Sequence, residues 1–140
     1  MAIVSDYVLR PIGVVRSQLT ARAEAPRQGS EGAPEAWVEI GPAFADALDG
    51  VAAGDEVILL TWLHLSHRDV LRVHPRGDPE QPLTGVFATR SPDRPNPIGL
   101  HRIHVLEIDA SARLRVSPLE AVDGTPVVDI KPVLASSADD

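Results

Sequence analysis

The sequence contains no cysteine, which excludes disulfide bonds, thiolate metal sites and cysteine nucleophiles. Lysine is almost absent: the sequence contains twelve arginines and a single lysine, Lys131. Arginine is the side chain suited to forked recognition of carboxylate and phosphate. The longest strongly apolar stretch, residues 57–63, is far shorter than the roughly 18 residues of a membrane span. The N-terminus lacks a basic start followed by an apolar segment, so no signal peptide is predicted. A cytoplasmic protein follows by elimination.

Charge is distributed unevenly along the chain. The net charge of −7 argues against a protein that binds nucleic acid by charge alone. Residues 68–102, however, hold six arginines and four acidic residues, a net of +2, whereas the rest of the chain holds a net of −9. The middle of the chain is therefore the one candidate surface for an anionic partner.

The predicted secondary structure consists mainly of short strands separated by turns. A length of 140 residues fits one domain, 1–140, and 44% apolar residues is typical of a soluble globular chain. A short helix is expected at 42–48, where proline begins it and Gly50 ends it. The expected strands cover residues 7–17, 36–40, 57–64, 70–74, 85–89, 98–108, 114–117 and 127–130.

This pattern predicts a mostly β protein, a closed or nearly closed antiparallel β-barrel with one or two short helices. A Rossmann fold is disfavoured, because the chain has no G-x-G-x-x-G motif and no long helices alternating with strands. Gly13 within the first strand indicates a bulge or a close backbone approach. The continuous apolar run 57–64 indicates a strand buried on both faces.

The segment 87–100 is the densest chemical signal in the chain. Its three prolines within six residues fix φ, remove N–H donors and push the preceding residues toward extended geometry. Such a segment is pre-organised, and it presents Arg90, Arg94 and Asn96 as polar groups on a rigid ridge. The alternative interpretation is a stiff connector between two barrel strands.

Two further segments give weaker signals. Pro26-Arg27-Gln28 lies in a long polar loop, where a solvated arginine is the ordinary interpretation. Asp123-Gly124 precedes a β-branched stretch and is mainly a turn signal. A buried Asp129 or Lys131 beyond that turn would need a partner.

The histidines raise the question of a metal site. His64 and His67 are three residues apart, and so are His101 and His104. A strand places positions three apart on opposite faces, so neither pair forms a natural clamp if these segments are strands. No cysteine supports them, and a functional metal site is not predicted.

Four blocks, taken in order, resemble the TsaA-like family, the TrmO type of S-adenosylmethionine-dependent tRNA methyltransferase. The resemblance extends from residue 12 to residue 132, and the blocks are specific in combination. The blocks are Pro26-Arg27-Gln28, then His64 after an apolar strand, then Thr89-Arg90-Ser91-Pro92 with Arg94-Pro95-Asn96-Pro97-Ile98-Gly99, then Val122-Asp123-Gly124-Thr125-Pro126 with Asp129-Ile130-Lys131-Pro132.

The resemblance implies a β-barrel, a homodimer and a reaction. The reaction is methylation of the exocyclic N6 of threonylcarbamoyl-adenosine beside the anticodon of tRNA. Carried over by position, the residues expected to bind S-adenosylmethionine are Pro26, Arg27, Gln28, His64, Leu65, Arg90, Leu100, Glu120, Ala121, Val122 and Asp123.

Physical chemistry gives several of these positions a role. A guanidinium such as that of Arg90 suits the carboxylate of the cofactor as a bidentate partner. Backbone groups near a turn can bind the edge of an adenine, and the side chains of Leu65 and Leu100 can cover its ring. Asn96 and Asp129 are the candidates for orienting the accepting amine or taking its proton. Most of the acceleration of a methyl transfer can come from positioning.

The chain departs from the family pattern at three points. His101 stands where serine is common, and Val133 stands where tyrosine is common. The C-terminal domain of longer members is expected to be absent. Two alternatives therefore stay open: a methyltransferase of the same fold with a small-molecule substrate, and a non-catalytic barrel that binds a nucleotide-like ligand.

Overall fold

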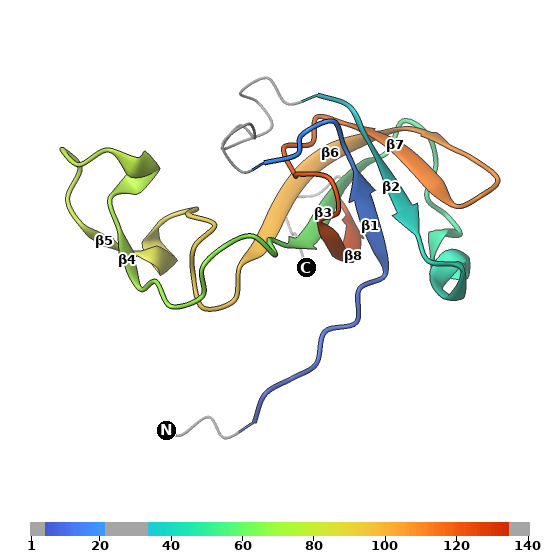
Figure 1. Ribbon diagram of the computed structural model, residues 1–140. Helices are drawn as coiled ribbons and strands as arrows, with labels where there is room; N and C mark the ends of the chain where they lie inside the picture. Colours follow the sequence, from blue (N-terminus) through green and yellow to red (C-terminus); the bar gives the residue numbers. More distant parts are fainter. Residues whose placement is uncertain (1–4, 22–33, 135–140) are drawn as a thin grey trace.

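Six strands form a closed antiparallel barrel, in agreement with the fold expected from the sequence. The structure is a computed structural model and describes residues 5–21 and 34–134. The strands follow one another around the barrel in the order β1-β2-β7-β6-β3-β8, and β8 pairs with β1 to close it (Figure 1). They are β1 (Gly13–Arg16), β2 (Ala36–Ile40), β3 (Glu56–Trp62), β6 (Ile98–Ile108), β7 (Arg113–Ser117) and β8 (Pro126–Pro132).

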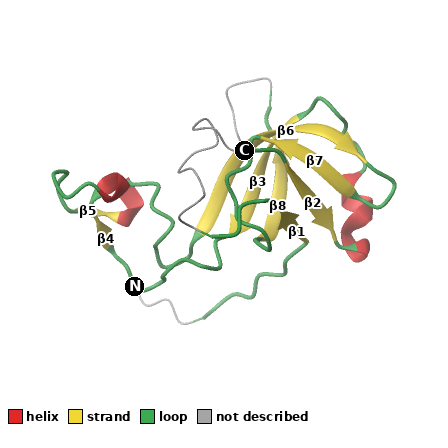
Figure 2. Ribbon diagram, turned by 45° about the horizontal axis from the view of Figure 1, so that its top comes forward, coloured by secondary structure: helices red, strands yellow, loops and turns green. Residues whose placement is uncertain are grey.

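An arm, defined here as residues 63–97, leaves the barrel between β3 and β6. Figures 1 and 2 both show it extending to one side of the barrel. It contains a small two-stranded sheet and two short 3-10 helices. These elements are β4 (Arg72–Val73), η4 (Pro75–Gly77), β5 (Thr84–Gly85) and η5 (Val86–Ala88).

The described helices are all short. The longest is the 3-10 helix η3 (Pro42–Leu48), which begins at the expected proline and lies beside the barrel, away from the arm (Figure 1). Within residues 5–21 and 34–134, no helix is both long and apolar enough to cross a membrane.

Alternation along the strands builds the core of the barrel. On β6, the side chains of His101, Ile103 and Val105 are buried, while those between them are exposed or half-buried. On β3, Leu59 and Thr61 are buried in the same way. Since successive side chains of a strand point to opposite faces, the buried set lines the inside of the barrel. Val15, Val38, Leu114, Val116 and Val127 from the other strands complete that lining.

Three expectations about local structure were wrong. The 57–64 strand is not buried on both faces: Ile58 and Leu60 are only half-buried, because their side chains point away from the barrel interior. Residues 85–89 do not form one strand, since the chain turns into η5 and the Thr89 amide bonds back to the carbonyl of Val86. The first strand is confined to Gly13–Arg16, whereas 7–17 was expected.

Gly13 makes the close backbone approach that the sequence indicates. It pairs with Ile40 across β1 and β2, and a Cβ at this position would collide with the carbonyl oxygen of Glu39. Gly13→Ala is therefore expected to lower the free energy of unfolding by about 1–3 kcal/mol, as overpacking does. Urea unfolding measures this change. Gly85→Ala is the matched control, because a Cβ there meets nothing within 4 Å; equal midpoints for both variants would contradict the close approach.

Candidate functional site

The turn that carries the family's last block is held by the end of β1. The amide of Asp123 donates to the carbonyl of Leu19 over 2.6 Å, and its Oδ1 accepts from the amide of Ser17 over 3.0 Å. Gly124, with φ of 85°, completes the turn by donating to the carbonyl of Val15. The 119–123 segment is thus fixed to the strand that precedes the long polar loop.

The same segment is also hydrogen-bonded to the residue at the other flank of that loop, just before β2. The amide of Leu119 donates to the carbonyl of Pro34 over 3.1 Å. Both flanks of the loop are therefore bonded to the 119–123 segment, although more than 80 residues separate them in sequence. The predicted cofactor residues Pro26, Arg27 and Gln28 belong to this loop and lie outside the described residues.

Within the segment, Ala121 and Val122 are buried and so can offer a ligand their backbone rather than their side chains. The hydroxyl of Thr125, itself buried, donates to the carbonyl of Val122 over 2.7 Å. Asp123 is exposed, and its carboxylate is engaged by Ser17. Ligand binding by backbone groups near this turn stays a prediction, and the carbonyl of Val122 is already engaged by Thr125.

A buried polar chain runs from the barrel interior to Glu120. The hydroxyl of Thr61 lies 2.7 Å from Nε2 of His101, and Nδ1 of His101 is hydrogen-bonded to Oε1 of Glu120. Thr61 is fully buried and His101 is 4% exposed. Sequence reasoning selected Glu120 but gave no role to Thr61 or His101. The signal was present in His101, which departs from the serine common in the family.

Gly99 provides the space for the hydrogen-bonded side chains of Thr61, His101 and Glu120. It pairs with Thr61 across β3 and β6, and a Cβ there would lie 2.7 Å from Nε2 of His101 and collide with the Thr61 hydroxyl. The glycine of the Arg-Pro-Asn-Pro-Ile-Gly motif therefore has a packing role inside the barrel, two residues beyond the proline ridge.

On the arm, hydrogen bonds bring His64 and Leu65 beside the proline ridge. The amide of Leu63 donates to the carbonyl of Pro97 over 2.8 Å, and the amide of Arg94 donates to the carbonyl of His67 over 3.1 Å. The segment that follows β3 thus lies against the ridge. Both His64 and Leu65 are exposed there.

The arginines of the ridge divide by their partners. Arg94 donates to three carbonyls, those of Val86, Thr89 and Ser91, at 2.5–2.8 Å. It is a structural brace rather than a group presented to a ligand. Arg90 is exposed, and no hydrogen bond or ion pair joins it to another residue in the described parts of the chain. Arg90 is therefore the guanidinium that the ridge presents.

Asn96 is exposed and is oriented by a neighbouring arginine. Arg68 donates to Oδ1 of Asn96 over 2.9 Å and to the carbonyl of Pro95 over 2.6 Å, and its guanidinium lies 5.1 Å from the centre of the Trp62 ring. Because Oδ1 accepts from Arg68, the amide N–H groups of Asn96 are turned to the other side. They can donate to an acceptor on a substrate.

Asp129 lies on the outer wall of the barrel. Leu60 pairs with Asp129 on one side and with Leu100 on the other, so the three residues form one row across β8, β3 and β6. The Asp129 side chain is 48% exposed and lies 3.7 Å from the ammonium of Lys131. Leu100 is half-exposed in the same row.

The predicted site residues that the structure describes lie in two parts of the molecule. One is the 119–123 segment with Glu120, joined to the barrel interior. The other comprises the arm and the outer wall, with His64, Leu65, Arg90, Asn96, Leu100 and Asp129. Strand β6 connects them, because Leu100 and His101 are consecutive and face opposite sides of the wall.

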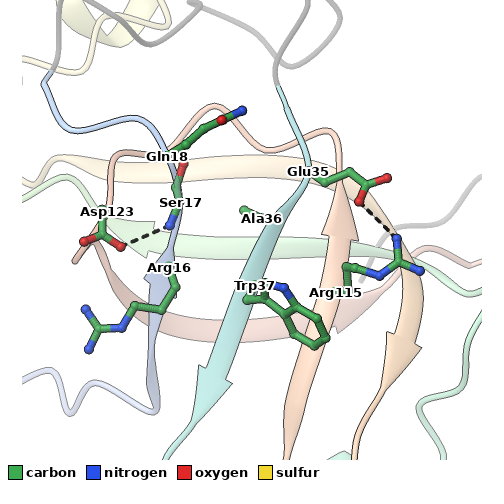
Figure 3. A pocket seen from close by; sticks show the side chains of 8 residues that line it. All are labelled: Arg16, Ser17, Gln18, Glu35, Ala36, Trp37, Arg115 and Asp123. Atoms are coloured by element: carbon green, nitrogen blue, oxygen red, sulfur yellow. Dashed lines mark hydrogen bonds and ion pairs between the residues drawn. The ribbon is translucent and has the colours of Figure 1, made fainter.

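An open hollow of about 640 Å³ lies where the flanks of the long loop meet the barrel (Figure 3). Asp123 is its one member among the predicted site residues. Its arginines are engaged: hydrogen bonds to Glu107 and Glu35 raise the pKa of Arg115, and Arg16 pairs with Glu39. The residues that line it are Arg16, Ser17, Gln18, Glu35, Ala36, Trp37, Arg115 and Asp123.

The histidines do not gather around a common point. His101 faces the barrel interior, whereas His104 is exposed and lies 3.6 Å from Glu56, as expected for positions three apart on a strand. Among the residues that the structure describes, no three His, Asp or Glu side chains are placed to hold a metal ion.

Comparison with known proteins identifies the family. The family model of the tRNA-methyltransferase O N-terminal domain matches residues 14–139. The chain belongs to this family. An S-adenosyl-L-methionine-binding protein of Archaeoglobus fulgidus is 44% identical over 124 residues, which cover 89% of this chain and 87% of that protein. A protein of Methanothermobacter thermautotrophicus, named "Probable S-adenosyl-L-methionine-binding protein", is 48% identical over 124 residues, covering 89% and 88%.

Solved structures of TrmO share the fold. A crystal structure of TrmO from Pseudomonas aeruginosa superposes with a TM-score of 0.72 and is 29% identical, covering 97% of this chain and 61% of that one. A second TrmO structure has a TM-score of 0.74 and 30% identity, covering 99% and 61%. This chain therefore spans about three fifths of the length of the solved TrmO chains.

Proposed function

We propose that this protein is an S-adenosylmethionine-dependent methyltransferase that acts on the exocyclic N6 of threonylcarbamoyl-adenosine beside the anticodon of tRNA. Membership of the tRNA-methyltransferase O family carries the proposal. The names of the archaeal relatives support the cofactor. We place this activity in the cytoplasm and in a single domain, 1–140.

The two groups of site residues suit the two ends of the cofactor. Arg90, exposed and without a partner in the described chain, suits the carboxylate of the methionine part. The backbone of the 119–123 segment suits the adenine, because the turn is rigid and its hydrogen bonds within the described chain use the amides of Leu119 and Asp123 but not those of Glu120 and Ala121. Leu65 and Leu100 are exposed apolar side chains that can cover the cofactor.

Bound S-adenosylmethionine supplies an electrophilic methyl group. The protein has to place the accepting nitrogen in line with that group and remove the proton that the nitrogen loses. Asn96, its amide N–H groups turned away from Arg68, can hold an acceptor on the substrate. Asp129, a half-exposed carboxylate on the outer wall, can take the proton.

A second candidate is a barrel that binds S-adenosylmethionine without transferring its methyl group. The observation that favours it is that the named archaeal relatives are described as binding proteins rather than enzymes. Release of S-adenosylhomocysteine separates the candidates. The purified protein with labelled cofactor and bulk tRNA is expected to label the RNA. Cofactor binding with no labelling of any RNA pool, at any salt concentration, would favour the second candidate.

The proposal includes a homodimer, which the exposed apolar side chains of the arm support. Phe87 is 85% exposed, and it is one of six large exposed apolar side chains on the arm and β6. The partner that fits this surface is a second copy, whose ridge would complete a shared pocket. The other exposed apolar side chains of the arm and of β6 are Leu65, Leu71, Leu83, Ile98 and Leu100.

Phe87→Asp is expected to convert the dimer into a monomer without unfolding it, because the side chain is exposed in the single chain and contributes little to its core. Sedimentation velocity reports the mass, and thermal unfolding reports the fold. Tyr7→Asp is the matched control, since Tyr7 is 88% exposed but lies far from the arm in sequence. A wild-type protein that sediments at the monomer mass would refute the dimer.

A further inference from the structure

Glu120 differs from the other paired carboxylates of the described chain. Its side chain is 14% exposed, and its partner is His101. The other carboxylates in described ion pairs are more exposed, and each pairs with an arginine or with Lys131, Glu56 pairing with exposed His104 as well. A carboxylate so enclosed needs good hydrogen-bond partners to offset its loss of water.

The imidazole of His101 holds this carboxylate in one orientation. The network is satisfied when Nδ1 carries the proton: Nδ1–H donates to Oε1 of Glu120, and Nε2 accepts from the hydroxyl of Thr61. Thr61 is fixed by its place in β3, and Gly99 leaves the room that the two polar atoms need. The ring therefore has two anchors, and Glu120 inherits its position from them.

The second oxygen of Glu120 remains available. Within residues 5–21 and 34–134, His101 is the one hydrogen-bond partner of this carboxylate. No buried side-chain oxygen or nitrogen in the described chain lacks a partner. Oε2 is therefore open to the surface, beside the backbone of the 119–123 segment. It is an acceptor whose orientation is set by His101.

We propose that Glu120 binds the ribose hydroxyls of the nucleoside cofactor, and that His101 is a positioning residue that aims Glu120 at them. This rests on the proposed function. The methionine carboxylate belongs at Arg90 on the arm, and the ammonium group is attached to the same carbon as that carboxylate. The donors left for the 119–123 segment are those of the nucleoside, and hydroxyl groups suit an ionised carboxylate.

The first test uses Glu120→Gln with ligands that differ in one part. Calorimetry measures the binding of S-adenosylhomocysteine, of 5′-methylthioadenosine, which lacks the amino acid part, and of the 2′-deoxy form of 5′-methylthioadenosine. The variant is expected to bind the first two roughly tenfold more weakly than wild type, by equal factors. The 2′-deoxy compound keeps only the 3′-hydroxyl, so the difference in its affinity between wild type and variant is expected to be smaller.

Two results would overturn this assignment. If Glu120→Gln weakens S-adenosylhomocysteine but not 5′-methylthioadenosine, the carboxylate faces the amino acid end of the cofactor. If it weakens the binding of neither ligand, Glu120 has only a structural role as the partner of His101. A wild-type protein that binds none of the three ligands is a different result, because it refutes the proposed function itself.

The second test separates positioning from packing at His101. In His101→Asn the amide can still donate from the place of Nδ1 to Glu120, whereas in His101→Gln it reaches toward Thr61 and leaves Glu120. His101→Asn is expected to bind 5′-methylthioadenosine within about threefold of wild type, and His101→Gln roughly tenfold more weakly. Equal losses in both variants would reduce His101 to a packing residue. If His101→Gln does not fold, the Glu120→Gln comparison decides the ribose assignment. His101→Asn then tests His101 alone, and a tenfold loss of affinity for 5′-methylthioadenosine in that variant would overturn its positioning role.

Discussion

Replacing Arg90 by alanine is expected to weaken S-adenosylmethionine binding by a factor on the order of 10 to 100 without changing the stability of the protein. The factor corresponds to one or two hydrogen bonds between charged groups. Stability is unaffected because Arg90 is exposed and has no partner among the described residues. Isothermal calorimetry and thermal unfolding measure the two quantities.

Two control variants sharpen this prediction. Arg72, on β4, is also an exposed arginine of the arm, so Arg72→Ala removes the same charge from the same element and is expected to leave binding unchanged. Arg90→Lys keeps the charge but cannot form the planar fork, and it is expected to recover only part of the lost affinity. Wild-type affinity in Arg90→Ala would contradict the assignment of the ridge as a cofactor site.

Replacing Asp129 by asparagine is expected to lower kcat for methyl transfer by a factor on the order of 10² to 10⁴, the usual effect of losing a general base. Cofactor affinity is expected to stay the same, because Asp129 acts on the accepting nitrogen and not on the cofactor. The side chain is half-exposed and paired only loosely, at 3.7 Å, with Lys131, so the fold does not depend on it.

Glu107→Gln is the matched control for Asp129. The Glu107 side chain is 49% exposed, nearly the same fraction as the 48% of Asp129. It also pairs with a basic residue on the outer wall, Arg115. Single-turnover rates of both variants across a range of pH separate a proton acceptor from a general loss of charge. A wild-type rate in Asp129→Asn would mean that the proton passes directly to water.

Much of the barrel was predictable from local sequence. Strand β6 was predicted with its observed bounds, Ile98–Ile108, because the proline-rich segment precedes it and a polar turn at 109–112 follows it. The helix at 42–48 was predicted from its proline and following glycine, although it folds as a 3-10 helix. The strand prediction for residues 85–89 was wrong. The β-branched and aromatic residues there favour a strand locally, but the hydrogen bonds of Thr89 and Arg94 to the Val86 carbonyl impose a turn.

The candidate site was predictable in part, and for a different reason. The family resemblance selected Arg90 and residues 120–123 directly. The Thr61–His101–Glu120 chain could not be predicted, because it depends on the register of β3 against β6 and on barrel closure. Residues 40 positions apart meet there, and neither a threonine in an apolar strand nor a lone histidine indicates such a contact.

The measurement that tests the account most directly is mass spectrometry of nucleosides from tRNA treated with the protein and S-adenosylmethionine. The tRNA should carry threonylcarbamoyl-adenosine without its N6 methyl group. The account predicts that this nucleoside is converted to its N6-methylated form, and that the conversion requires Arg90. The contradicting result is tRNA whose threonylcarbamoyl-adenosine stays unmethylated although the cofactor binds, as shown by a rise in Tm on the order of 10 °C at saturating S-adenosylmethionine. That result would leave a binding protein or an enzyme with a small-molecule substrate.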